Sequence, residues 1–123
     1  KYTQLCSHIL SLKNMKKYER YGNAIYTIQL NSLDKGLHNL RGKWGFFYEY
    51  EIDDLNKIKN YINNKYQTLT YFGLNKNILR NFILKNQLEG IDRVVPVGQA
   101  LDINFFWDGY DLNKILSRVV DIK

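Results

Sequence analysis

The chain has 123 residues, which fits one domain and is short for a complete two-substrate enzyme. Hydrophobic residues make up 45% of it and aromatic residues 15%, which excludes the disordered class. No apolar run nears the roughly 20 residues that span a bilayer, and the charged N-terminal segment lacks the apolar centre of a signal peptide. We therefore expect a cytoplasmic protein with no membrane partner. The short length and the absent initiator methionine also predict a fragment of a longer protein.

The formal net charge of +6 is unevenly distributed along the chain. Residues 1–43 hold eight Lys and Arg against Glu19 and Asp34, whereas the remainder holds ten basic against ten acidic residues. This basic N-terminal third could face a nucleotide phosphate, a nucleic acid or an acidic neighbouring domain. A solvated basic surface is the alternative, and we favour it.

The N-terminal segment predicts a helix, a strand and a loop. Residues 2–12 carry three apolar side chains at helical spacing on one face: Leu5, Ile9 and Leu12. Residues 24–30 are rich in β-forming residues and follow a Gly-Asn pair, which indicates a strand. The polar residues 32–43 are expected to form a loop.

The clearest strand pattern lies at residues 44–52. Its second half alternates tyrosine and isoleucine with Glu49 and Glu51, so these two carboxylates share one face. Asp53 is placed to cap a helix over residues 54–64, because its carboxylate can accept the free amide hydrogens of the first turn.

Two further strands flank a helix in the second half of the chain. The strands are expected at residues 66–72 and 93–97, and the helix between them is capped by Asn75 and ends at Gly90. A last helix is expected over residues 111–120.

The fold class that follows is α/β, with a small parallel-core sheet flanked by helices, in a single domain over residues 1–123. Strands and helices alternate with short links in residues 44–97, which predicts right-handed crossovers and parallel pairing there. Pro96 cannot donate a ladder hydrogen bond, so its strand is expected to be an edge or to end near that residue.

Few residues have the surroundings that catalysis or metal binding needs. Cys6 and His8 point in different directions on a helix, so Cys6 is interpreted as a small buried hydrophobe. Glu49 and Glu51 could do acid and base work, but an exposed polar strand face is the favoured interpretation. His8 and His38 are the only histidines, and no spacing supports a metal site. Tyrosines interleaved with lysines could stack on single-stranded nucleic acid, but most fall at core positions, so no nucleic-acid partner is expected.

Three motifs follow one another in a fixed order in the second half. Gln67-Thr68-Leu69 comes first, GIDRVVPVGQALD spans residues 90–102, and WDGYDL spans residues 107–112. In this order they resemble the C-terminal end of the bacterial acyl-CoA reductases, the fatty-acid reductase component of bioluminescence systems, within the aldehyde dehydrogenase superfamily. A weaker likeness extends over residues 20–66.

The resemblance implies a function for the parent protein. In that family a cysteine thiol takes the acyl group from CoA, and a nicotinamide cofactor reduces the thioester to an aldehyde. The chain would be the C-terminal part of such an enzyme, would bind no cofactor itself and would be inactive alone, with NADPH held by an upstream domain. The implied partner is the rest of the parent chain; the resemblance also allows an acyl-transferring synthetase and a homo-oligomer.

The chain departs from the family pattern at two positions. The superfamily glutamate that holds the nicotinamide ribose would fall on Gly42, and Cys6 lies too close to the Gln-Thr strand to be the family's nucleophile. No catalytic residue is therefore expected here.

The candidate site is a substrate-binding or structural turn formed by Gln67, Thr68, Arg93, Trp107, Asp108 and Gly109. Asp108 is expected to accept backbone amides, Gly109 to take a positive φ and Trp107 to cover apolar surface. A structural turn is favoured over a lining of the acyl entrance. The alternative function is a stand-alone α/β interaction domain whose basic N-terminal third binds an acidic partner or a nucleotide.

Overall fold

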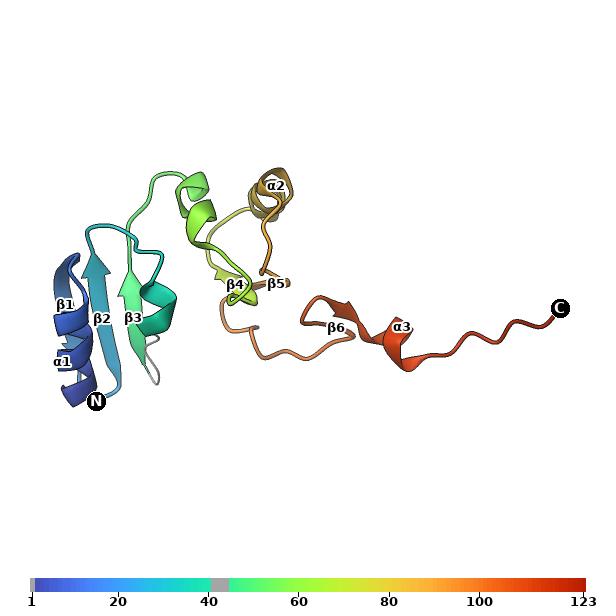
Figure 1. Cartoon of the computed structure of the whole chain (residues 1–123), viewed down its shortest axis with the longest axis horizontal. Coiled ribbons are helices and arrows are strands. Elements are labelled where there is room, and N and C mark those ends of the chain that lie inside the picture. Colours follow the sequence, from blue (N-terminus) through green and yellow to red (C-terminus); the bar gives the residue numbers. More distant parts are fainter. Residues whose placement is uncertain (1, 41–44) are drawn as a thin grey trace. The chain divides into compact units, whose positions relative to one another are not determined.

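The computed structural model describes residues 2–40 and 45–123 of the chain (Figure 1). The chain forms two compact units, Lys1–Tyr61 and Ile62–Lys123, and each is described by itself. The described ranges leave out the following residues of the sequence analysis: Lys1, Arg41, Gly42, Lys43 and Trp44.

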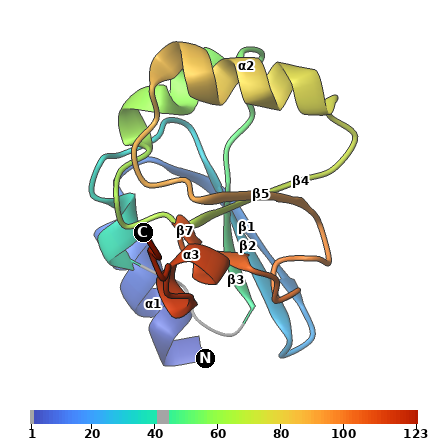
Figure 2. The same ribbon diagram turned by 90° about the vertical axis from the view of Figure 1, so that its right-hand side faces the viewer.

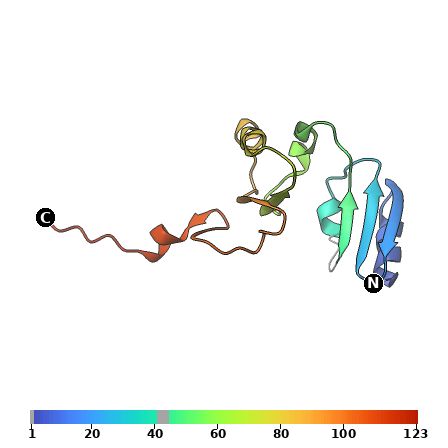
Figure 3. The ribbon, with the colours of Figure 1, turned by 180° about the vertical axis from the view of Figure 1, so that it is seen from behind.

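The first unit contains a three-stranded sheet with a helix against it. Its elements are α1 (Tyr2–Ser11), β1 (Met15–Tyr21), β2 (Ile25–Leu30), the 3₁₀ helix η1 (Leu37–Leu40), β3 (Phe46–Glu49) and the 3₁₀ helix η2 (Leu55–Tyr61). The strand order is β1-β2-β3, with β1 antiparallel and β3 parallel to β2 (Figure 3). The predictions of a helix over residues 2–12 and a strand over residues 24–30 are confirmed.

The core of this unit lies between α1 and the central strand. Alternate residues of β2 point to the same face of the sheet, and Tyr26, Ile28 and Leu30 are buried there. Leu5 and Leu12 belong to the same buried cluster, which explains why the apolar stripe of α1 faces the sheet. The alternation of β2 and the position of α1 therefore both result from the burial of apolar side chains in one core.

Two segments of the first unit differ from the prediction. Residues 15–21 form β1, which was not expected, because this polar edge strand is largely exposed and has no apolar alternation. The helix expected over residues 54–64 is instead the short 3₁₀ helix η2. Its first turn is capped by Asp54, whose Oδ1 accepts the amide of Asn56 at 2.9 Å, whereas Asp53 pairs with Lys57 at 2.6 Å.

The second unit begins with a parallel strand-helix-strand crossover. Its elements are β4 (Thr68–Tyr71), α2 (Lys76–Asn86), β5 (Arg93–Pro96), β6 (Phe106–Trp107), β7 (Tyr110–Asp111) and α3 (Leu112–Leu116). The strands β4 and β5 pair in parallel, and Figure 2 shows α2 lying over them. Leu79 and Phe82 are the buried residues of α2. The parallel pairing expected for these two strands is confirmed. Because they form a two-stranded sheet, β5 is an edge strand, and Pro96 is its last residue, as expected.

The ends of α2 are set by two different residue types. Asn75 caps its start by accepting the amide of Asn77 at 2.8 Å, as expected. The helix ends before Gln87, which takes the left-handed conformation at φ 47°, so the expected stop at Gly90 is wrong. Gly90 has another role: a Cβ there would lie 2.2 Å from the carbonyl oxygen of Asn63, so only glycine allows the two backbones to approach.

The prediction that residues 44–97 form one parallel unit is wrong. β3 pairs with β2, and β4 pairs with β5, so β3 and β4 belong to separate sheets. A parallel crossover usually contains a full α-helix, and the short η2 between β3 and β4 does not supply one. The fold is nevertheless mixed α/β, with small sheets and helices, and in residues 2–40 and 45–123 parallel pairing occurs only between β2 and β3 and between β4 and β5.

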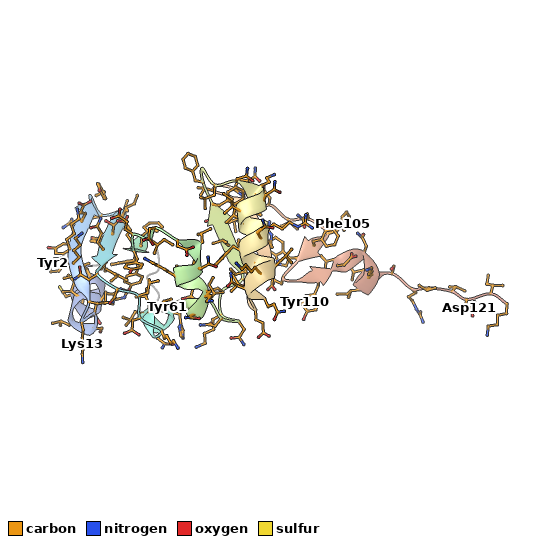
Figure 4. All side chains as sticks on the ribbon, turned by 90° about the horizontal axis from the view of Figure 1, so that it is seen from above. Tyr2, Lys13, Tyr61, Phe105, Tyr110 and Asp121 are labelled. Carbon is orange, nitrogen blue, oxygen red and sulfur yellow. The ribbon has the colours of Figure 1, made fainter. Side chains whose placement is uncertain are left out.

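The C-terminal segment is less helical than the sequence indicates. The helix expected over residues 111–120 ends at Leu116, and Ser117 is extended at φ −105° and ψ 157°. Val119 and Val120 are 96% and 79% exposed, so no apolar contact supports a longer helix. Figure 4 shows the extended segment at Asp121. No helix in the described ranges is both long and apolar enough to cross a membrane.

Candidate functional site

The six residues of the candidate turn gather at the beginning of the β4–β5 sheet. Thr68 lies opposite Arg93 in the parallel register. The carbonyl oxygen of Gln67 accepts the amides of Asp92 and Arg93, at 2.9 and 3.1 Å. The first of the three motifs is therefore joined to the second by backbone hydrogen bonds. We call this set, Gln67, Thr68, Arg93, Trp107, Asp108 and Gly109, the Arg93 cluster.

The Arg93 side chain joins the second motif to the third. Its guanidinium donates from Nη1 to the carbonyl oxygen of Ala100 at 2.8 Å and from Nη2 to that of Asp102 at 2.7 Å. Its central carbon lies 4.5 Å from the centroid of the Trp107 ring, which is a cation–π contact. The planar fork of arginine can bind two acceptors and stack on a ring at once, and lysine cannot. Arg93 thereby fixes the path of the chain between β5 and β6.

The Trp-Asp-Gly sequence forms a tight hairpin. Phe106 pairs with Asp111 and Trp107 with Tyr110, which leaves Asp108 and Gly109 as a two-residue loop. Both loop residues have positive φ, 48° and 79°, as a type I′ turn requires. Asp-Gly is among the sequences that favour this turn. Figure 4 labels Tyr110 at the start of the second strand.

The turn also lies close to the residue that precedes β5. A Cβ on Gly109 would lie 3.1 Å from a carboxylate oxygen of Asp92, which is closer than ordinary packing contacts. Glycine at this position therefore serves both the positive φ and the close approach.

The amide acceptor next to this turn is Asp111 rather than Asp108. The Asp111 carboxylate accepts the amide of Asn113 at 3.1 Å and caps α3. The Asp108 carboxylate has no hydrogen bond to the described part of the chain. Its residue type is instead explained by the backbone, because aspartate tolerates the left-handed conformation better than most residues do.

A second polar arrangement, which the sequence did not indicate, lies in the first unit. The Tyr48 hydroxyl contacts Nδ1 of His8 and donates to the carbonyl oxygen of Leu40 at 2.5 Å. The two rings are stacked, with centroids 5.8 Å apart. Burial lowers the pKa of His8 and raises the pKa of Tyr48 to about 12, so both groups are neutral near pH 7. His8 and Tyr48 are forty positions apart, and no local pattern links them.

This arrangement makes His8 unsuitable as an activating base for Cys6. His8, its nearest histidine in sequence, is buried and directs a ring nitrogen to Tyr48. Cys6 is half-buried and forms no disulfide. A nucleophilic cysteine needs a neighbouring base or cation that lowers its pKa, and His8 is not placed to act as one.

The two glutamates of the strand predicted over residues 44–52 meet in a shallow hollow. β3 ends at Glu49, so Glu51 lies beyond it. Both line a hollow of about 240 Å³ together with Lys16 and Gln29. Within the described ranges, no three His, Cys, Asp or Glu side chains come together as metal ligands.

Comparison of the chain with known proteins found no match among protein-family models, curated proteins or solved structures. The likeness to the acyl-CoA reductases therefore rests on the three sequence motifs that converge on Arg93.

Proposed function

We propose that the chain is the C-terminal part of a reductase that converts fatty acyl-CoA to aldehyde with a nicotinamide cofactor, NADPH, held by an upstream domain. The observation that supports this proposal best is the convergence of the three family motifs on Arg93. Gln67 binds the backbone of Arg93, and the Arg93 guanidinium in turn binds the segment that leads to Trp107. Motifs that resemble one family in their order also form one physical cluster.

In this proposal the Arg93 cluster is a scaffold for the substrate-side wall of the enzyme. The Arg93 guanidinium is engaged with two backbone carbonyls and the Gln67 carbonyl with two amides, and the turn conformation depends on two residues with positive φ. Such a cluster orders a surface loop, and a rigid loop can exclude water from a thioester in the neighbouring site. The acyl group and the hydride would be handled by residues of the upstream part.

The test begins with the reading frame that encodes these residues. We expect it to extend upstream and to encode a cysteine motif there, and the whole protein to form aldehyde from tetradecanoyl-CoA with NADPH or NADH. The chain alone should form none. The control is Cys6→Ser in the whole protein, which should leave aldehyde formation unchanged because the nucleophile lies elsewhere. A frame without an upstream extension, or a whole protein that forms no aldehyde, would refute the proposal.

The competing function is a stand-alone interaction domain with a basic N-terminal third. It predicts that the chain alone binds an acidic peptide or a nucleotide, with shifts in the NMR spectrum confined to residues 13–35. Saturable binding of this kind, together with a frame that has no upstream extension, would establish it in place of the reductase.

A further inference from the structure

A cavity of about 550 Å³ lies between α2 and the β4–β5 strands, outside the Arg93 cluster. Its volume is within the range of small-molecule sites. It is lined by these residues: Tyr71, Lys76, Leu79, Arg80, Ile83, Leu84, Val94, Val95, Pro96 and Gln99. The lining includes no carboxylate, so its two charged groups are both cations.

The lining residues of α2 form one face of the helix. Lys76, Leu79, Arg80, Ile83 and Leu84 follow the spacing that places side chains above one another. The two cations occupy the first half of the helix, and the apolar residues Ile83 and Leu84 occupy the second. Since an α-helix rises about 1.5 Å per residue, this face is about 12 Å long. The cavity thus has a cationic end and an apolar end.

The cations are available to a ligand. Lys76 and Arg80 are exposed, and neither forms an ion pair with the described part of the chain. Lys76 is also the first residue of the helix, where the helix dipole favours an anion. A guanidinium beside an ammonium suits a carboxylate, which it can bind through two parallel hydrogen bonds.

The opposite wall supplies apolar surface. Val94, Val95 and Pro96 of β5 are half-buried, and Leu79 at the base of the cavity is 2% exposed. Leu84 is 63% exposed, so the apolar end is open to solvent and would lose contact with water when covered. An anion without an apolar tail would leave this end empty.

We propose that this cavity binds an amphipathic carboxylate, with its head between Lys76 and Arg80 and its aliphatic tail along Ile83, Leu84 and Val94. The inference stands on the side chains of α2 and β5, and it is independent of the proposed reductase function. Decanoate is a suitable probe, because its extended chain is about as long as the lining face of α2.

The experiment is a titration of the ¹⁵N-labelled 123-residue chain with decanoate below its micelle concentration, followed by NMR. We expect saturable shifts of the amides of residues 76–84, 94, 95 and 97–99. Arg80→Gln should weaken binding about tenfold, since it removes a charged hydrogen-bond donor. Lys85→Gln removes one positive charge from the same helix outside the lining, and should leave the affinity unchanged. Each methylene removed from the ligand should weaken binding about two- to fourfold.

Four results would overturn the inference. Decanol binding as tightly as decanoate would show that the cations do not recognise a head group. Inorganic phosphate producing the same shifts with the same affinity would show an anion site without a tail. Equal effects of Arg80→Gln and Lys85→Gln, or shifts that do not saturate, would show that no defined site exists.

Discussion

Replacing the half-buried Arg93 by methionine should destabilise the second unit more than replacing any of its exposed charged residues does. The side chain makes two hydrogen bonds to carbonyl oxygens, of which the one to Ala100 is part-buried and the one to Asp102 exposed, and it stacks on Trp107. A charged donor contributes about 1.5 kcal/mol at a part-buried site and less at an exposed one, and an exposed cation–π contact contributes about 0.5–1 kcal/mol. We expect Arg93→Met to lower the free energy of unfolding by about 2 kcal/mol.

The assay is urea unfolding followed by tryptophan fluorescence. The chain has two tryptophans, so a Trp44→Phe background leaves Trp107 as the reporter within the second unit. For a unit of this size the urea dependence is about 1 kcal/mol per molar, so the midpoint should fall by about 2 M. The midpoint is the quantity to compare, because loss of the stacked guanidinium also changes the emission of the native state.

Two matched variants separate the shape of the side chain from its charge. Arg93→Lys keeps the charge but cannot bind both carbonyls, so its midpoint should lie between those of the parent and Arg93→Met. Arg118→Met removes the same side chain from the exposed C-terminal segment and should leave the midpoint unchanged. If Arg93→Met unfolds at the same urea concentration as Arg118→Met, the cluster does not depend on Arg93.

Three further predictions concern the turn, the helix cap and the buried histidine. Gly109→Ala should lower the free energy of unfolding by about 1–2 kcal/mol, and more than Gly73→Ala does in a matched urea titration, because both glycines have positive φ but only Gly109 lies against another side chain. Asp111→Ala should lower the free energy of unfolding by about 1 kcal/mol, because it removes the cap of α3. Asp108→Asn keeps a residue suited to the turn and should change the urea midpoint little, and a larger effect of Asp108→Asn than of Asp111→Ala would contradict the hydrogen bonding described. Burial lowers the pKa of His8 below its usual 6.5, so the unfolded state binds the proton more tightly. Stability should therefore be full above pH 6.5 and fall as the pH drops through the folded-state pKa. In a pH series of urea titrations, His8→Gln should flatten this part of the stability profile, and an unchanged slope would count against the assignment.

The elements that the sequence predicted correctly are those with a strong local signal. α2 has an apolar stripe and Asn75 as its cap, and β2 alternates buried and half-exposed residues. β1 has neither feature, because an edge strand can be polar on both faces and still pair with its neighbour through the backbone. The sequence predicted the pairing of the strands less well, because the pairing of β3 with β2 depends on contacts between residues about twenty positions apart.

The candidate site shows the same division between local and long-range information. The motif residues and the positive φ of Gly109 could be predicted from local sequence. The bonds from Arg93 to the carbonyls of Ala100 and Asp102 could not, because any residue supplies a carbonyl and the sequence carries no mark of which one is used. The cavity beside α2 was missed for a similar reason, since Lys76 and Arg80 are ordinary surface residues until the neighbouring strand is placed.

The mixed pairing of the first sheet has a consequence for the order in which the chain folds. The antiparallel β1–β2 hairpin closes over a short turn and can form within about 1–10 μs, whereas β3 must first close the longer segment that follows Leu30. During synthesis at about 5–20 residues per second, the nineteen residues from Leu30 to Glu49 take about 1–4 s to emerge. During that time the edge of β2 that later pairs with β3 has no partner strand, and the apolar face of β2 lies next to this open edge. The nascent chain is therefore most exposed to misassembly before β3 is made, and a chaperone or a pause that acts on it should act in this interval.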